Sequence, residues 1–429
     1  MFISDLSNSV NQKVKLTGWV YNLRSSGKIR FILLRDGTGI TQCVLEYSEE
    51  TKNAFGVCET LTQESVVEVQ GVVKKWKNGF EIQASDLRLI STSEPYPISK
   101  KEHGIDFLMN HRHLWMRSKK THAVLRVRHH IIHAIHNFFN YKYFTQIDPP
   151  IFTPTACEGT STLFEVQMDF MDSVYLSQSG QMYLEAASAA FNQVYCLSPT
   201  FRAEKSSTRR HLMEFWMCEA EMAFCDLNQN MVLIEEFIVS IIQYVLKSAK
   251  EELNTLGRDL SLLEKIKTPF PKLHYDSACE HLIKKNPQFI KGSDFGGADE
   301  TLISSLYDQP VFVHHYPSQV KAFYMKQDNR EGYSLSCDLL APEGYGELVG
   351  GGQRETDKDV LIKAIQHHQL DQKDFEWYLD LRRYGSFVHS GFGLGVERLV
   401  SWLCGLDHVR EAIPFPRVYG RKFFEQPSS

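Results

Sequence analysis

Phe201-Arg-Ala-Glu204, followed by Arg209-Arg-His-Leu212 and Glu214-Phe215, is one of two stretches from which this chain can be interpreted. The other, Gly391-Phe-Gly-Leu-Gly-Val-Glu-Arg398, comes near the C-terminus. A phosphoryl or adenylyl transfer needs fixed positive charge where negative charge develops, and arginine supplies it permanently in a planar fork. Spaced glycines allow a backbone to approach a nucleotide closely. Because the chain has no Gly-x-x-x-x-Gly-Lys-Ser/Thr loop, we expect any ATP to be held in another way.

Length and composition predict a globular protein of more than one domain. The chain has 429 residues, of which 43% are hydrophobic and 23% charged. Its net charge of −5 gives no bulk support for nucleic-acid binding, although a local patch would suffice. No apolar run approaches the ~20 residues of a membrane span, and the N-terminus does not resemble a signal peptide. Nine cysteines without a Cys-x-x-Cys pair favour reduced thiols, so we expect a cytoplasmic protein without a zinc site or a disulfide framework.

The N-terminal part is predicted to be a small barrel. Apolar and polar residues alternate in several short segments with turn signals between them. These are the alternating segments Val14–Val20, Ile40–Leu45 and Ser65–Val73, and the turns Arg35–Gly39 and Lys77–Gly79. About five strands in ~80 residues suggest an oligonucleotide-binding (OB) fold, which commonly holds single strands. We therefore expect a domain over residues 1–95, with a linker over residues 96–117 that begins near Ser93–Pro97.

The remainder, residues 118–429, is predicted to be an α+β domain. Apolar residues recur at helical spacing from about 119 to 140, and Pro149 and Pro150 then require an extended segment. Another helix is expected over residues 231–252. Strand-like runs at Gln193–Leu197 and Pro310–Val313 accompany the arginine stretches. We expect a largely antiparallel sheet flanked by helices.

Both arginine stretches resemble motifs of the class II aminoacyl-tRNA synthetases. Residues 201–215 look like motif 2 and residues 391–398 like motif 3, while Asp148-Pro-Pro150 is similar to motif 1, which builds the dimer interface in that class. The barrel matches the anticodon-binding domain of the aspartyl, asparaginyl and lysyl subgroup. These four features occur in the family's order over nearly the whole chain. The resemblance implies an OB-fold barrel joined to a class II catalytic domain, and a homodimer.

Within this subgroup the chain is most similar to the asparaginyl members. Ser177–Gln181, Glu214–Glu221 and Ile413–Arg417 follow their pattern, and the lysyl pattern differs around the motif 2 arginine. Aspartyl members have a lysine after Gln-Ser-Pro-Gln that grips the substrate carboxylate, and this chain has none there. A carboxylate at Glu185 would accept a hydrogen bond from an asparagine amide and repel an aspartate. The resemblance therefore implies L-asparagine and tRNA(Asn) as substrates.

The same resemblance implies a nucleotide site on motifs 2 and 3, with Arg202 and Arg398 as its catalytic residues. Arg202 would hold the α-phosphate of ATP while the amino-acid carboxylate attacks it and pyrophosphate leaves. Arg398 would contact the γ-phosphate and the adenine, and Phe215 would stack on the adenine. The other expected ATP-binding residues are Glu204, Arg210, His211 (at the leaving phosphates) and Glu347.

Two further groups of residues are expected around the substrates. Asp338 and Glu347, ahead of a glycine turn, suit Mg²⁺, a hard ion that takes few carboxylates together with substrate phosphates, and the family places metal ligands there. Arg354 would donate to the side-chain carbonyl of asparagine. Glu158 and Gln181 resemble positions that receive the α-amino group, and an ammonium requires such acceptors.

In the barrel, the resemblance implies an anticodon site at Phe31, Gln42 and Glu81. An aromatic ring such as Phe31 would stack on a base, which contributes ~1–3 kcal/mol in single-strand binders. The loop Lys205–Arg209 departs from the family, because it is more basic than usual at a place that normally touches the tRNA acceptor end.

Three alternatives remain open from the sequence. The first is an aspartyl enzyme with relaxed tRNA choice, which the missing lysine disfavours. The second is a synthetase-like enzyme repurposed for asparagine synthesis, although an enzyme of small molecules has no need of the barrel. The third is a non-catalytic RNA-binding or regulatory module, which would have little reason to keep Arg202, Asp338, Glu347 and Arg398.

Overall fold

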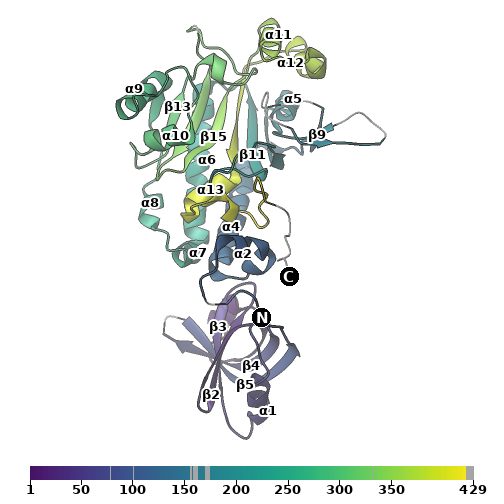
Figure 1. Ribbon diagram of the computed structural model, residues 1–429, viewed down its shortest axis with the longest axis vertical. Coiled ribbons are helices and arrows are strands. Elements are labelled where there is room, and N and C mark those ends of the chain that lie inside the picture. The colour runs from purple at the N-terminus through teal and green to yellow at the C-terminus, as the bar shows by residue number, and fades with distance from the viewer. Residues whose placement is uncertain are drawn as a thin grey trace. The chain divides into compact units, whose positions relative to one another are not determined.

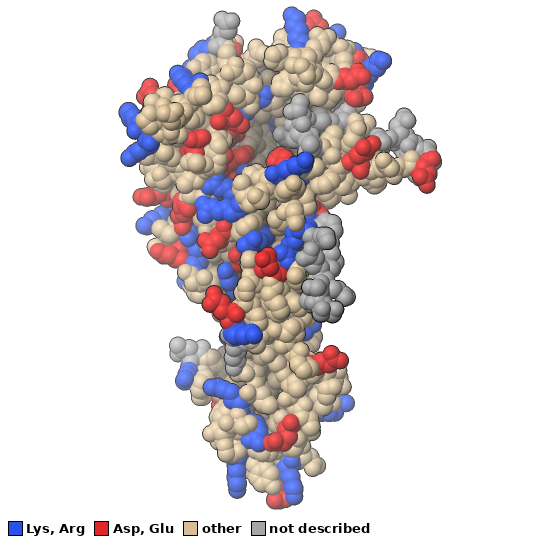
Figure 2. All heavy atoms as spheres, in the orientation of Figure 1, with Lys and Arg blue, Asp and Glu red and all other residues tan. Residues whose placement is uncertain are grey.

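The computed structural model describes residues 1–77, 79–99, 101–154, 157, 163–169, 174–330 and 332–421. The chain forms two compact units, Met1–Leu108 and Met109–Ser429, shown in Figure 1. On the face in Figure 2, basic and acidic side chains are intermingled over each unit, in keeping with the small net charge. In the described part of the chain, no helix is both long and apolar enough to cross a membrane.

The first unit is a five-stranded closed barrel of strand order β1-β2-β3-β5-β4, which confirms the predicted OB-type fold. Its elements are η1 (Ile3–Ser9), β1 (Lys13–Ser26), β2 (Ile29–Arg35), β3 (Ile40–Glu46), α1 (Lys52–Cys58), β4 (Val66–Trp76) and β5 (Gly79–Ser91), and the boundary between the units falls within α2 (Ile105–Asn110). Alternate residues of the strands, such as Leu16, Ile32 and Val69, are buried in the barrel core. Only glycine fits at position 71, because a Cβ atom there would lie 2.3 Å from the carbonyl oxygen of Gln83.

The second unit is built on an eight-stranded sheet of order β12-β13-β14-β15-β16-β11-β10-β6. Its strands are β12 (Lys272–His274), β13 (Val311–His314), β14 (Ser336–Ala341), β15 (Gly346–Gln353), β16 (His389–Gly395), β11 (Glu214–Ala223), β10 (Gln193–Phe201) and β6 (Thr145–Gln146). The inner pairs are antiparallel as predicted, whereas each edge strand, β12 and β6, pairs in parallel. The sheet is therefore mixed, with an antiparallel centre.

Helices α4 (Lys119–Tyr141), α6 (Leu227–Ser248) and α13 (Val396–Cys404) cover one face of this sheet and form the main core with it (Figure 1). The helix predicted over residues 119–140 is α4. The helix predicted over residues 231–252 begins earlier, because the side chain of Asp226 caps it together with Gln229. It also breaks at Ala249, whose φ of −132° is not helical, and α7 (Lys250–Thr255) follows.

The opposite face of the sheet is lined by glycines. Across the β11–β16 pair, Met217, Glu219 and Glu221 lie opposite Gly395, Gly393 and Gly391. The next strand, β15, places Gly350 and Gly352 beside Gly393 and Gly391. Because these positions carry no side chain, the middle of this face is left open for a ligand and for long side chains from its borders.

The second unit also contains several smaller elements. They are α3 (Arg112–Trp115), a three-stranded sheet of β7 (Phe152–Thr153), β9 (Val174–Leu176) and β8 (Glu165–Val166), α5 (Gln181–Phe191), α8 (Leu260–Glu264), α9 (Tyr275–Lys285), α10 (Gly297–Ser304), η2 (Ser318–Val320), α11 (Lys358–His367), η3 (Gln372–Phe375), α12 (Glu376–Arg383) and η4 (Val409–Glu411). Of these, α5 and α12 contact each other and border the glycine-lined face near Glu221.

Candidate active site

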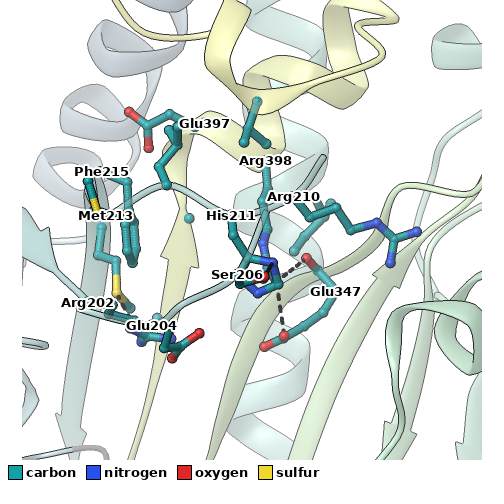
Figure 3. A pocket seen from close by; sticks show the side chains of 16 residues that line it. Arg202, Glu204, Ser206, Arg210, His211, Met213, Phe215, Glu347, Glu397 and Arg398 are labelled. Carbon is teal, nitrogen blue, oxygen red and sulfur yellow. Dashed lines mark hydrogen bonds and ion pairs between the residues drawn. The ribbon is translucent and has the colours of Figure 1, made fainter. Parts of the chain in front are cut away.

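A pocket opens on the glycine-lined face where the two arginine stretches meet (Figure 3). The strand β11, the loop before it, β15, β16 and the start of α13 supply its walls. Its lining residues are Arg202, Glu204, Ser206, Arg210, His211, Leu212, Met213, Phe215, Met217, Glu347, Leu348, Gly393, Gly395, Glu397, Arg398 and Val409. The structure thus brings together all seven residues predicted to bind ATP.

Arg202 and Phe215 form one side of this pocket. The guanidinium carbon of Arg202 lies 5.4 Å from the ring centroid of Phe215, within range of a cation–π contact. Arg202 Nη2 also lies 3.9 Å from Sδ of Met217. Phe215 packs against Leu212 and Val409 on its other side, so its ring is held at the pocket wall. A flat ring beside a guanidinium suits a nucleobase with a phosphate next to it.

Arg398 reaches across the pocket toward Glu347, as Figure 3 shows. Its Nη1 donates to the backbone oxygen of Glu347 and to the carboxylate Oε2, each at 3.0 Å. Burial acts to raise the pKa of Glu347, but Arg398 and Lys321 outweigh it and the pKa is lowered. Glu347 is therefore held ionised beside the arginine.

Arg210 and His211 close the pocket on the loop side. Arg210 forms an ion pair with Glu300 at 3.1 Å and donates to Thr301 and to the backbone oxygen of Gly344. His211 Nδ1 contacts the hydroxyl groups of Ser206 and Thr208. Burial and then Arg398 lower the pKa of His211, so the imidazole is neutral at neutral pH.

Glu397 joins α13 to α4 and to β11 beneath the pocket. Its carboxylate lies 2.7 Å from Arg128 Nη1 on α4 and accepts a hydrogen bond from the backbone N–H of Trp216 on β11. Both charged side chains are almost fully buried. Since Glu397 sits in the first turn of α13, one carboxylate fixes this helix against the other two segments.

Asp338 and Glu347 approach the same point above Gly350. A Cβ atom on Gly350 would lie 2.9 Å from Oε1 of Glu347 and 3.6 Å from Oδ1 of Asp338. Lys321 Nζ holds Asp338 Oδ2 at 2.7 Å. Burial raises the pKa of Asp338 to about 7, with Lys321 opposing and Glu347 adding to the shift. Two crowded carboxylates of this kind suit a divalent cation.

Asp338 and Glu347 form a pair of acidic side chains without a third ligand of that kind among the described residues. The described part of the chain holds no group of three or more His, Cys, Asp or Glu side chains arranged to bind a metal ion. A cation at Asp338 and Glu347 would therefore take its other ligands from water and from the substrate. This donor set fits Mg²⁺ better than zinc, which needs three or four protein ligands.

Farther along the glycine-lined face, Arg354 and Glu221 form a buried ion pair. Arg354 Nε and Nη2 donate to the two carboxylate oxygens of Glu221, each at 3.0 Å. Both side chains are 2% exposed or less. Gly391 makes room for this pair, because a Cβ atom there would lie 1.8 Å from Oε2 of Glu221. The pair is two-pronged and buried, and it offers both donor and acceptor atoms to a neutral group such as an amide.

Glu185 differs from its expected role as a direct partner of the substrate amide. Its side chain is completely buried, and four side chains donate to its two oxygens at 2.8–3.1 Å. The donors are Gln181, Tyr378, Arg382 and His389. Burial acts to raise its pKa, but Arg382 and His389 outweigh it and the pKa is lowered. The carboxylate is ionised and already saturated by protein donors.

Of the two residues predicted to receive the α-amino group, only Gln181 can be placed. It lies in the first turn of α5, next to Glu185, and is largely buried. Glu158 lies outside the described residues. A third acceptor, Glu219, stands nearby and accepts from the backbone N–H of Gly180 at 2.7 Å and from the hydroxyl of Ser179.

The barrel residues predicted to contact an anticodon lie on three neighbouring strands. Phe31, Gln42 and Glu81 alternate with the buried core positions, so they share the outer surface of β2, β3 and β5. Gln42 Nε2 donates to Glu81 Oε2 at 3.0 Å, and Arg24 lies 5.9 Å from the ring centroid of Phe31. An aromatic ring, an amide and charged groups side by side match a single-strand binding surface.

Several site residues were missed by the sequence analysis. Glu221 was visible, because Glu219 and Glu221 are acidic residues two apart among the apolar residues that follow Glu214 in β11. Lys321, Tyr378, Arg382 and His389 gave no local signal, since each joins the site only through the fold.

Comparison with known proteins agrees with this geometry. Residues 104–419 match the family model "tRNA synthetases class II (D, K and N)", and residues 14–90 match "OB-fold nucleic acid binding domain". The asparagine–tRNA ligase of Sorangium cellulosum is 55% identical, with 97% of each chain covered. That of Desulforamulus reducens is 52% identical over 98% of this chain and 99% of its own.

A solved structure shares both the fold and much of the sequence. The asparaginyl-tRNA synthetase of Pyrococcus horikoshii, complexed with asparaginyl-adenylate, superposes with a TM-score of 0.95 at 41% identity, and 99% of each chain is covered. The order of the motifs, the pocket that they form and these relatives agree. The chain belongs to the class II tRNA synthetases of the D, K and N group, and within it to the asparagine–tRNA ligases.

Proposed function

We propose that this chain activates L-asparagine with ATP and transfers the asparaginyl group to tRNA(Asn). The observation that carries the proposal is the buried Arg354–Glu221 pair, which lies on the same glycine-lined face as the pocket of Arg202 and Arg398. The asparagine–tRNA ligases to which it is so similar support the same activity.

Arg354 and Glu221 would select the side chain of asparagine. An amide presents one carbonyl acceptor, which Arg354 can serve, and an NH2 donor, which Glu221 can accept. Aspartate would bring a second carboxylate next to Glu221, whose charge already neutralises Arg354. Two carboxylates at one buried site repel each other strongly, so this pocket discriminates against aspartate.

The nucleotide pocket would then promote attack on ATP. A carboxylate oxygen of asparagine attacks the α-phosphorus, the bond from that phosphorus to the bridging oxygen breaks, and pyrophosphate leaves with the electron pair. Arg202 would hold the α-phosphate, while Arg398, Arg210 and His211 would face the leaving phosphates. Phe215 would stack on the adenine. Catalysis is then electrostatic and positional, and the protein forms no covalent bond to the substrate.

Asp338 and Glu347 are the residues that would hold Mg²⁺. When bound, the ion would neutralise charge on the phosphates of ATP. The contribution of the chain itself is to keep both carboxylates at one point, with Lys321 orienting Asp338 and Arg398 orienting Glu347.

The barrel would recognise the anticodon of tRNA(Asn) through Phe31, Gln42 and Glu81. Phe31 supplies a stacking surface, and the Gln42–Glu81 pair supplies hydrogen-bonding groups on the adjoining strands. The match of residues 14–90 to a nucleic-acid-binding OB fold supports this use. The asparaginyl group would pass to the terminal adenosine of the same tRNA.

A homodimer would complete the enzyme. Exposed aromatic side chains gather where several elements end beside the edge strand β6: Tyr141, Tyr143, Phe191 and Phe224. Backbone hydrogen bonds of 2.7 and 2.6 Å connect Ala223 to Asn192 and Phe224 to Val388, so these ends adjoin. Apolar surface next to an open strand edge favours a second copy as its cover. Light scattering of the purified protein would test this, and a monomer of 49.4 kDa would contradict it.

ATP–pyrophosphate exchange is the direct test of the activity. Asparagine, aspartate and lysine are offered separately, and we expect exchange with asparagine alone. Exchange with aspartate would reassign the amino acid. A lack of exchange with all three, in a protein that still binds tRNA, would favour a non-catalytic role. Charging of tRNA(Asn) and tRNA(Asp) transcripts then tests the second substrate.

A further inference from the structure

The carboxylate of Glu185, whose oxygens already accept hydrogen bonds from protein donors, determines the orientation of the side-chain amide of its neighbour Gln181. A glutamine amide has a donor end, NH2, and an acceptor end, the carbonyl oxygen, and can rotate to present either. Gln181 Nε2 lies 3.1 Å from Oε1 of Glu185. An ionised carboxylate only accepts hydrogen bonds, so this contact requires the NH2 end of Gln181 to face Glu185.

The opposite end of the same amide is then fixed as well. Gln181 Oε1 must point away from Glu185, and among the described residues it accepts no hydrogen bond. The family resemblance places the α-amino group of the substrate at this position, and an ammonium has only donors. A carbonyl oxygen is the matching partner of an ammonium. An NH2 group in its place would repel the ammonium and would itself lack a hydrogen-bond acceptor.

Glu185 itself cannot turn to follow a change in Gln181. Tyr378 lies 2.8 Å from both of its oxygens, while Arg382 and His389 each lie 2.9 Å from Oε2. These partners come from α12 and from the first residue of β16, and the Arg382 and Glu185 side chains are 1% exposed or less. The negative charge is therefore held rigidly in place behind Gln181.

We propose that Glu185 is a positioning residue that sets the amide of Gln181 in one orientation, so that its carbonyl oxygen meets the α-ammonium group of asparagine. The proposal rests on the activity proposed above. A glutamine at position 185 would have the same shape, but it could pair with either end of the Gln181 amide. Only a carboxylate there enforces a single orientation.

The test distinguishes binding of the α-ammonium group from binding of the rest of the substrate. Succinamate is asparagine without its α-amino group, so it cannot report on a contact with the ammonium. The KM of asparagine and the inhibition constant of succinamate are measured in pyrophosphate exchange for the wild type, Glu185→Gln and Glu376→Gln. The last is a matched control, because Glu376 is a half-exposed carboxylate on α12 that pairs with Arg383.

Glu185→Gln should raise the KM of asparagine by about tenfold or more, as expected for a weakened hydrogen bond to a charged group, and change succinamate binding by less than about twofold. Glu376→Gln should match the wild type. Equal weakening of both ligands would overturn the proposal, because a merely structural network would affect the whole pocket. An unchanged KM for asparagine would overturn it too.

A second variant covers the case in which Glu185→Gln fails to fold. Glu185→Gln combined with Arg382→Gln removes both members of the ion pair, so it leaves neither of them as an unpaired buried charge. The same selective loss of asparagine binding is expected. If the wild type itself shows no exchange with asparagine, the proposed activity fails, and that result is distinct from any outcome in the variants.

Discussion

Substitution of Glu221 by glutamine should change which amino acid the pocket prefers. Glu221 and Arg354 are both buried, and two hydrogen bonds of 3.0 Å join them. Removing one member of such a pair leaves an uncompensated charge, at a cost of about 3 kcal/mol or more. An aspartate carboxylate in the pocket can neutralise Arg354 again, whereas an asparagine amide cannot. At about 1.4 kcal/mol per tenfold change, the preference for asparagine over aspartate should fall by about a hundredfold.

The assay compares kcat/KM for asparagine and aspartate in pyrophosphate exchange. Glu376→Gln serves again as the control, since it makes the same chemical change at a half-exposed position on α12. Thermal unfolding establishes that each variant is folded. If folded Glu221→Gln kept the wild-type preference within about threefold, the charge argument for this pocket would be refuted.

Four other predictions concern separate parts of the molecule. Arg202→Ala should lower exchange by about a hundredfold or more, by analogy with lost oxyanion donors, and near-normal exchange would contradict its role at the α-phosphate. Gly391→Ala should impair asparagine activation, because its Cβ would lie 1.8 Å from a Glu221 oxygen, and full activity would show that this pair can move freely. Phe31→Ala should weaken tRNA binding by ~1–3 kcal/mol in a filter-binding assay and leave exchange intact, and a loss of exchange would be inconsistent with an anticodon role. Burial and two neighbouring histidines lower the pKa of His314 from 6.5 to about 4, so the stability due to its neutral form is present above pH 6.5 and is lost as the pH falls toward 4. Urea unfolding of His314→Gln should therefore show a weaker dependence on pH between 7 and 4, and an unchanged slope would count against this assignment.

The sequence predicts most of the fold because its signals are local. The alternation in β1, β3 and β4 and the helical spacing of α4 depend on neighbouring residues alone. The parallel edges of the large sheet were not predictable in this way. The strand β6 has two residues and β12 has three, which is too short for a periodic pattern.

The same distinction between local and long-range signals applies to the residues of the candidate site. The pocket residues Arg202, Phe215 and Arg398 belong to contiguous patterns, and the structure gathers them as expected. Glu185 could be singled out, but its surroundings could not, because Tyr378 and His389 lie 193 and 204 positions later in the chain. A carboxylate looks free in a sequence until the fold shows which donors surround it.

The contacts of the Glu397 carboxylate have a consequence for how the catalytic unit unfolds. The carboxylate ties α13 to α4 through Arg128 and to β11 through Trp216, so the floor of the nucleotide pocket is continuous with the main core. A pocket formed by a loop without such contacts could unfold locally while the rest of the domain stays folded. Here the backbone amides beneath the pocket should exchange with deuterium only when the whole catalytic unit unfolds. The nucleotide site and the domain that carries it would therefore be lost in a single cooperative event.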